Sequence, residues 1–370
     1  MKKILFPFIF FVFLLFFILL LLSVTSKIYL LKKKEFLLQN NEQINFYEKY
    51  YKTLHHLRGT DPCNLKCNSV EEFIFTKFIY NQKNNKTILI QGDSRAESIS
   101  IFSVNKWIKE NNIIKKKINI INSGTSSYSP STHEVQLNLL INEFRIKPST
   151  VILLIDPTDI GDENCRYKKN LVFDSEKKLI AINNEKDGNN IYYIDETLLS
   201  SKIYNSNFFK SIIFMPDFIY SISKRRIEYF FGKRNECPYS EIQKYLISSY
   251  NNENAHFIER LQSYINNFLK YDFAERLYIV TYPHIQHLDN GVTYGMKYST
   301  KTSDLVNEAI KNIETQKKII HINFFDENIF PDLKKNSDYF KYFIKDDLAA
   351  HLTDTANIIF YNKILEKIHF

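Results

Sequence analysis

The sequence predicts an α/β fold whose mainly parallel sheet is covered by helices on both faces. Two observations predict it: short apolar runs read as strands, and helix-like segments fall between them. The predicted strands are 87–92, 118–123, 150–156, 276–282 and 318–324, and the predicted helices lie near 96–111, 131–145, 240–271, 299–316 and 354–368. Near-continuous apolar strands are typical of parallel sheets that are buried on both faces.

The N-terminal segment predicts one transmembrane helix. Residues 4–22 carry no charged side chain, and about 20 such residues are needed to cross the hydrocarbon core of a membrane. A secretory signal usually has a shorter apolar stretch, of about 7 to 15 residues, followed by a small-x-small cleavage site. Residues 22–26 fit that cleavage site poorly, so we expect an uncleaved anchor over 1–26, with a cleaved signal as the alternative.

Charge and cysteine content bear on which side of the membrane the rest of the chain lies. Lysines at 27 and 32–34 follow the span and, by the positive-inside rule, would keep the domain in the cytoplasm. Against this, short N-terminal tails with lysine commonly stay inside, and an even set of cysteines is compatible with two disulfides. That set is Cys63, Cys67, Cys165 and Cys237. We expect a single-pass cell-membrane protein with an extracytoplasmic domain; unpaired thiols in a cytosolic domain are the alternative.

After the anchor we expect a membrane-proximal helical stalk and linker over 27–84, then one α/β domain over 85–370. A polar and then aromatic-rich stretch at about 164–240 interrupts the strand and helix alternation, and we interpret it as an insertion or cap over the carboxyl edge of the sheet. The formal net charge is +8, but the lysines are scattered, so we expect no nucleic-acid partner. Cys63 and Cys67 have no second close pair, so zinc is not expected.

Small and polar residues follow the strands at one predicted edge of the sheet. They form four blocks: Gly92-Asp93-Ser94, Ser123-Gly124, Asp156-Pro157-Thr158-Asp159, and the late segment 346–353 with His351. Acyl transfer needs this inventory, because a serine attacks, a histidine removes its proton, an acid orients the histidine and N–H groups hold the oxyanion.

In order and position, these blocks resemble the SGNH, or GDSL-like, hydrolase superfamily over roughly residues 85 to 365. The resemblance implies a flavodoxin-like three-layer α/β/α sandwich. It also implies Ser94 as nucleophile and oxyanion donor, Gly124 as a second donor and His351 as the base. No cofactor is implied.

Two blocks depart from that family's pattern. Thr158 stands where the family usually has an asparagine that donates to the oxyanion, and a hydroxyl can donate only one hydrogen bond. The family's acid lies three residues before its histidine, whereas Asp347 lies four before His351 and Asp346 five before. We expect a one-residue loop extension to bring Asp347 to the imidazole, with Asp346 as the second candidate.

Other polar residues at this edge have two interpretations each. A metal site could be suggested by Asp156, Asp159, Asp162 and Glu163, but we expect solvated loop carboxylates and no metal. Asp159 is also the side chain that matches the family's third block. His284 follows the fourth strand and would contact either substrate or neighbouring core residues. The basic cluster at 224–234 would face anionic lipid or glycan, or be a solvated helix face.

Together these features predict a serine esterase or O-acyltransferase that acts on ester-linked acyl groups, acetyl above all, of an envelope glycan. The expected partners are an acylated or acyl-accepting carbohydrate and the membrane. The alternative is a catalytically silent module of the same fold that binds a glycan or an envelope protein. The sequence indicates neither the acceptor nor the oligomeric state.

Overall fold

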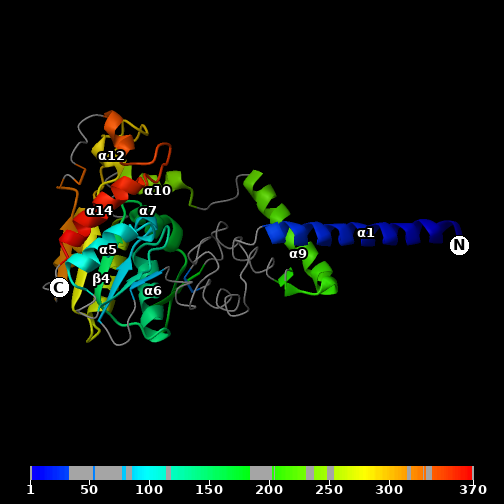
Figure 1. Cartoon of the computed structure of the whole chain (residues 1–370), viewed down its shortest axis with the longest axis horizontal. Helices are drawn as coiled ribbons and strands as arrows, with labels where there is room; N and C mark the ends of the chain where they lie inside the picture. Colours follow the sequence, from blue (N-terminus) through cyan, green and yellow to red (C-terminus); the bar gives the residue numbers. More distant parts are fainter. Residues whose placement is uncertain are drawn as a thin grey trace.

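The computed structural model describes residues 2–32, 53–54, 77–80, 86–113, 118–183, 202–203, 205–230, 237–247, 254–314, 318–327, 329–330 and 336–368. Its centre is a six-stranded sheet with strand order β1-β3-β2-β4-β7-β8 (Figure 1). The strands are β1 Lys77–Tyr80, β2 Lys86–Gln91, β3 Ile118–Asn122, β4 Pro148–Ile155, β7 Arg276–Thr281 and β8 Ile319–Asn323. All neighbouring pairs are parallel except β1 with β3. The predicted mainly parallel sheet is confirmed.

Helices cover both faces of this sheet. One layer contains α6 Pro130–Asn142, α11 Asn254–Leu269 and α13 Thr302–Lys311, and the other contains α5 Ile101–Glu110 and α14 Asp354–Glu366. Alternate strand residues enter the two cores: Leu89 and Leu153 pack with the first layer, while Ile90 and Ile152 pack with the second. The strands are therefore buried on both sides, which is why their sequences are continuously apolar.

The strand order locates the functional edge. The five parallel strands lie in the sheet in the order β3-β2-β4-β7-β8. The chain goes from β2 to β3 on one side and then returns to β4 on the other side of β2, so the direction of winding reverses between β2 and β4. In open α/β sheets, ligands bind outside the carboxyl ends of the strands at this reversal point. Ser94 begins α4 after the short turn that follows β2, and Asp156 comes directly after β4.

The predicted helices differ from the structure where side chains cap a turn. The predicted helix 96–111 consists of α4 Ser94–Glu97 and α5, because Ser100 Oγ accepts a hydrogen bond from Ser103 N at 3.2 Å and starts a new helix. The predicted helix 240–271 consists of α10 Tyr239–Ile247 and α11.

Most of the predicted stalk lies outside the described residues. Within it, β1 joins the sheet edge beside β3, and Leu54 is buried and bridges Ile182. Cys63 and Cys67 also lie outside the described residues.

After β4 come α7 Asp159–Gly161 and a π-helix over Asp162–Tyr167. The predicted insertion at about 164–240 begins within this π-helix and continues with the hairpin β5 Leu171–Phe173 and β6 Leu179–Ile182. A disulfide joins Cys165 to Cys237, 72 residues apart, and so ties the π-helix to the start of α10. The long helix α9 Phe208–Phe230 does not cap the sheet: it packs against α1 Lys2–Lys32, away from the strands (Figure 1).

The apolar N-terminal helix is confirmed. Within α1, residues Pro7–Thr25 are long and apolar enough to cross a membrane, and only 6% of this segment is buried by the rest of the chain. Two short elements complete the described fold near the carboxyl edge: α12 Ile285–Leu288 after β7, and a 3-10 helix over Asn336–Lys341 before the last loop.

Candidate active site

The turn between β2 and α4 presents Ser94. Gly92 has φ +152°, a conformation that side chains rarely allow, and a Cβ there would lie 2.8 Å from Ala96 Cβ and 2.9 Å from Leu154 Cβ. The helix is capped by Asp93, whose Oδ1 accepts a hydrogen bond from Arg95 N at 2.9 Å. Ser94 is thus the first residue of α4 rather than its cap, and its hydroxyl is free to face another partner.

That partner is His351. The Nε2 atom of His351 lies 2.8 Å from Ser94 Oγ, and its Nδ1 atom lies 2.6 Å from Asp347 Oδ2. Ser94 Oγ also lies 3.3 Å from Asp93 Oδ2, a longer contact than the one to His351. The structure therefore aligns a serine, a histidine and a carboxylate from the two ends of the domain.

The loop before α14 explains how Asp347 reaches across four residues. Within this loop, Ala350 has the left-handed conformation, with φ +53°, and directly precedes His351. The Asp347 carboxylate accepts hydrogen bonds from Ala349 N and His351 N, each at 3.0 Å, which folds the loop back on itself. Asp346, the second candidate, is exposed, and the carboxylate beside the imidazole belongs to Asp347.

Charge fixes the roles of the two imidazole nitrogens. Burial raises the pKa of Asp347, but the neighbouring His351 and the two backbone N–H groups outweigh burial and hold this pKa below its usual value. An ionised carboxylate can only accept hydrogen bonds, so His351 Nδ1 carries the proton and donates to Asp347. His351 Nε2 is then the lone-pair acceptor for the Ser94 hydroxyl, as a general base requires.

The predicted oxyanion donors are arranged differently. Gly124 lies against α4, where a Cβ would come within 2.3 Å of Glu97 N, so only glycine fits. Its N–H, however, already donates to Asn122 Oδ1 at 2.9 Å. The Ser94 N–H, at the open N-terminus of α4, has no acceptor within the described part of the chain.

Thr158, the third predicted donor, is also engaged. Its hydroxyl donates to Asp156 Oδ1 at 2.6 Å, and its N–H donates to the same oxygen at 2.8 Å. The side chain is buried at the start of α7. In this arrangement the hydroxyl stabilises the Asp156 carboxylate, and the Ser94 N–H remains the predicted donor without an internal acceptor.

We therefore expect Thr158→Val to affect stability more than turnover. Loss of a hydrogen bond to a charged group should cost about 1.5 to 3 kcal/mol of unfolding free energy. Loss of an oxyanion donor would instead lower kcat about 10²- to 10³-fold. Thermal unfolding and ester hydrolysis measured on the same preparation separate these outcomes, and a 100-fold lower kcat at unchanged stability would return Thr158 to the oxyanion hole.

Beneath Ser94 lies a buried carboxylate cluster formed by Asp93, Asp156 and Asp159, whose oxygens lie within 4.8 Å of one another. Arg95, only 4% exposed, balances it: Arg95 Nε lies 3.3 Å from Asp156 Oδ2. Burial opposes ionisation of Asp156, but Arg95 and then the Thr158 hydroxyl outweigh it and lower the pKa of Asp156. The same guanidinium donates to the Ala350 carbonyl oxygen at 2.7 Å, next to His351.

The other two carboxyls of the cluster have raised pKa values. Burial, followed by the charge of Asp156, raises the pKa of Asp93 well above its usual value. Burial, followed by the charges of Asp93 and Asp156, does the same for Asp159. A buried guanidinium beside two carboxyls whose pKa values are raised is a poor match for a divalent cation, which prefers ionised oxygen ligands. That the site binds no metal therefore stays a prediction, and the chemistry of these side chains supports it.

The raised pKa of Asp159 gives a pH-dependent prediction. The folded state keeps a proton on Asp159 that the unfolded chain releases near pH 4, so stability falls as pH rises above about 4, by up to about 1.4 kcal/mol per pH unit until the folded pKa is reached. Asp159→Asn removes this loss and should unfold at a higher temperature than the wild type, by a margin that grows as the pH rises above about 4. The exposed Asp272→Asn is the matched control. A margin independent of pH would contradict the assignment.

His284, a further candidate, lies below the surface rather than facing a substrate. Its side chain is fully buried and caps α12, since Nδ1 accepts from Gln286 N at 3.2 Å. Burial lowers its pKa to about 3. The ring lies 4.9 Å from that of Tyr298, which indicates a packing and capping role.

Sequence reasoning missed three residues that support the site. Arg95 follows Ser94 directly and looked like an ordinary helix residue; nothing in the sequence signals its burial. Tyr294 and Tyr239 donate from their hydroxyls to the carbonyl oxygens of Asp347 and Leu348, at 3.1 and 2.7 Å. Two tyrosines from separate elements thus hold the loop that carries Asp347.

Comparison with protein-family models and with curated proteins finds no match to this chain. Among solved structures, two variants of Axe2, an acetyl-xylooligosaccharide esterase from Geobacillus Stearmophilus, are similar in fold. They are each 10% identical, with TM-scores of 0.40 and 0.38, and the alignments cover 78% of this chain and 97% of theirs. Likeness at this level transfers neither chemistry nor substrate to the chain.

Proposed function

We propose that the chain is a serine esterase or O-acyltransferase that forms an acyl-enzyme on Ser94. The observation that carries this proposal is the continuous hydrogen-bonded line from Ser94 Oγ through His351 to Asp347, at 2.8 and 2.6 Å. These distances lie within the range required for a nucleophile, its base and the group that orients the base.

In this mechanism His351 Nε2 takes the hydroxyl proton as Ser94 Oγ attacks the carbonyl carbon of an ester. The Ser94 N–H, which has no acceptor among the described residues, donates a hydrogen bond to the developing oxyanion. His351 then returns the proton to the leaving alcohol, and the acyl group stays on Ser94. Asp347 stabilises the imidazolium between these two transfers.

The second half-reaction repeats these steps in reverse with a new hydroxyl. If His351 deprotonates water, the products are a carboxylic acid and free enzyme; if it deprotonates a sugar hydroxyl, the product is a new ester. We propose O-acetyl groups of an envelope glycan as the substrate class. Support comes from the sequence resemblance to SGNH enzymes, together with an apolar N-terminal helix that would hold the domain at a membrane surface.

A second candidate is a module of the same fold that binds acylated glycan without turning it over. The observation that favours it is that the N–H of Gly124 and the hydroxyl of Thr158 already donate inside the protein. With a single free donor, oxyanion stabilisation would be weak, because each donor contributes about 10² to 10³ in turnover.

Labelling with a fluorophosphonate probe separates the two candidates. We expect the full chain in detergent to be labelled and to release nitrophenol from p-nitrophenyl acetate, and Ser94→Ala to lose both. Wild-type labelling that is absent, or that persists in Ser94→Ala, would overturn the enzyme proposal. Adding a sugar acceptor then distinguishes hydrolysis from transfer, since only a transferase yields the acetylated sugar.

A further inference from the structure

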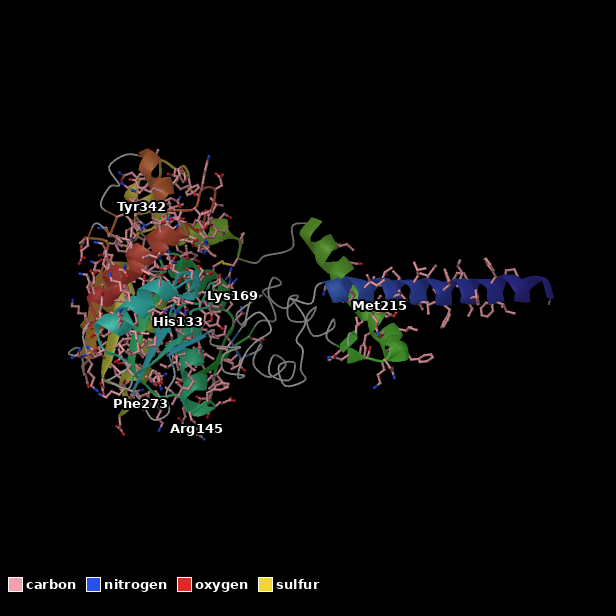
Figure 2. All side chains as sticks on the ribbon, viewed as in Figure 1. His133, Arg145, Lys169, Met215, Phe273 and Tyr342 are labelled. Carbon is pink, nitrogen blue, oxygen red and sulfur yellow. A yellow bond between two sulfur atoms is a disulfide. The ribbon has the colours of Figure 1, made fainter. Side chains whose placement is uncertain are left out.

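The helix α9 packs one of its faces on the end of α1. Met215 and Phe218 of α9 are buried with Ile203, and Leu22 of α1 packs against them. The Lys27 Nζ of α1 also donates to the Ser206 carbonyl oxygen at 3.2 Å. Figure 2 labels Met215 where the two helices cross. The insertion is therefore attached to the N-terminal helix through α9.

The opposite face of α9 is apolar and exposed. Helical spacings of four and seven residues place four large side chains on one side of the helix, because seven residues are close to two turns. They are Phe209, Ile213, Tyr220 and Ile227, which are 72%, 70%, 67% and 56% exposed. Phe209, Ile213 and Tyr220 each lie two residues along the chain from a buried residue of α9, and two residues correspond to a rotation of about 200° around the helix axis. This exposed stripe thus faces away from α1.

The level at which α9 meets α1 indicates what covers the stripe. Leu22 lies within the last turn of the apolar segment Pro7–Thr25, about 4.5 Å from its end at 1.5 Å per residue. Amphipathic helices at membrane surfaces lie about 5 to 10 Å deep, at the boundary of headgroups and acyl chains. We propose that α9 is an interfacial helix that lies beside the end of α1 in the membrane surface, with the exposed stripe among lipid acyl chains.

Continuity and charge favour lipid over a protein partner. The stripe adjoins α1, where large side chains from Phe8 to Val24 are themselves exposed and require an apolar surrounding. Lys210 lies on one flank of the stripe and is exposed, so its amine can reach anionic headgroups while its apolar stem stays beside the stripe. The stripe also contains Tyr220, and tyrosine is enriched at membrane interfaces.

The proposal also bears on α1. Removal of α1 as a signal sequence would take Leu22 away from the cluster of Met215, Phe218 and Ile203, whereas a retained α1 keeps this contact. The packing thus supports a retained anchor, and α1 with α9 would form one membrane-attached unit.

Tryptophan quenching by brominated lipids tests the depth of α9. The chain has one tryptophan, Trp107, which is buried in α5. The full chain carrying Tyr220→Trp is reconstituted into vesicles of phosphatidylcholine and phosphatidylglycerol, with bromine placed either near the glycerol end or deep in the acyl chains. Phe102→Trp, at a 65% exposed position of α5, is the matched control.

We expect bromine near the glycerol end to quench the added emission of Tyr220→Trp, and deep bromine to quench it less. Phe102→Trp and the wild type should show no loss. Quenching of Tyr220→Trp no greater than that of Phe102→Trp would overturn the proposal, and crosslinking between copies at α9 would then assign the stripe to a second copy. Stronger quenching by deep bromine would overturn the interfacial placement. Neither substitution touches the proposed catalytic groups, so esterase activity serves as the folding control for both.

Discussion

Replacing Ser94 with alanine is expected to lower kcat for an activated ester by about 10⁴- to 10⁶-fold, the range seen when a serine nucleophile is removed from an intact site. The reason is that no other hydroxyl among the described residues is hydrogen-bonded to His351 Nε2. Release of nitrophenol under single-turnover and steady-state conditions measures the loss. KM should change little, because Ser94 makes its bond only on the way to the transition state.

Ser98→Ala is the matched control, since Ser98 lies at the other end of α4 and its hydroxyl donates to the Arg95 carbonyl oxygen at 3.1 Å. It should retain kcat within about threefold, as expected for a surface change of less than about 1 kcal/mol. Comparable losses in both variants would mean that α4 is disturbed as a whole, and turnover retained in Ser94→Ala would remove Ser94 as nucleophile.

The second large effect is expected from Asp347→Asn, with a loss in kcat of about 10⁴-fold, as found when the orienting aspartate of a serine triad is made neutral. The amide can donate to His351 Nδ1, which would favour the tautomer with its proton on Nε2 and leave no lone pair for the Ser94 hydroxyl. Steady-state kinetics at several pH values measures this loss.

Asp346→Asn is a closely matched control. It removes the same charge from the neighbouring residue, whose side chain is exposed. It should keep wild-type kcat within about threefold, a change of less than about 1 kcal/mol. Equal losses in the two variants would assign the effect to loop charge rather than to orientation of His351. A loss confined to Asp346→Asn would reverse the assignment of the acid.

The parts of the fold that follow from continuous apolar runs were predicted closely. The strands β2, β3, β4, β7 and β8 each match a predicted run within two residues at either end, because burial on both faces leaves a strong pattern. The edge strand β1 was missed, since four residues that begin with Lys77 carry little pattern. The break before α5 depends on one side-chain cap at Ser100, which sequence periodicity does not reveal.

The site was predictable by residue type and order, but its hydrogen bonds were not. Sequence reasoning selected Ser94, His351 and Asp347, and the structure brings these three side chains into contact. It also selected Gly124 and Thr158, whose groups turn out to donate to Asn122 and Asp156. Which acceptor a short side chain or an N–H group chooses depends on local geometry of less than 1 Å, and the sequence does not contain that information directly.

The left-handed residue before His351 has a consequence for how such proteins are recognised. Ala350 is left-handed, and Asp347 Oδ2 lies 2.6 Å from His351 Nδ1 although three residues stand between the acid and the base. The contact between acid and base is therefore set by the conformation of the loop, and not by one fixed number of residues between them. A search that demands a fixed interval would pass over chains like this one, whereas a search for the two side chains at bonding distance would retain them.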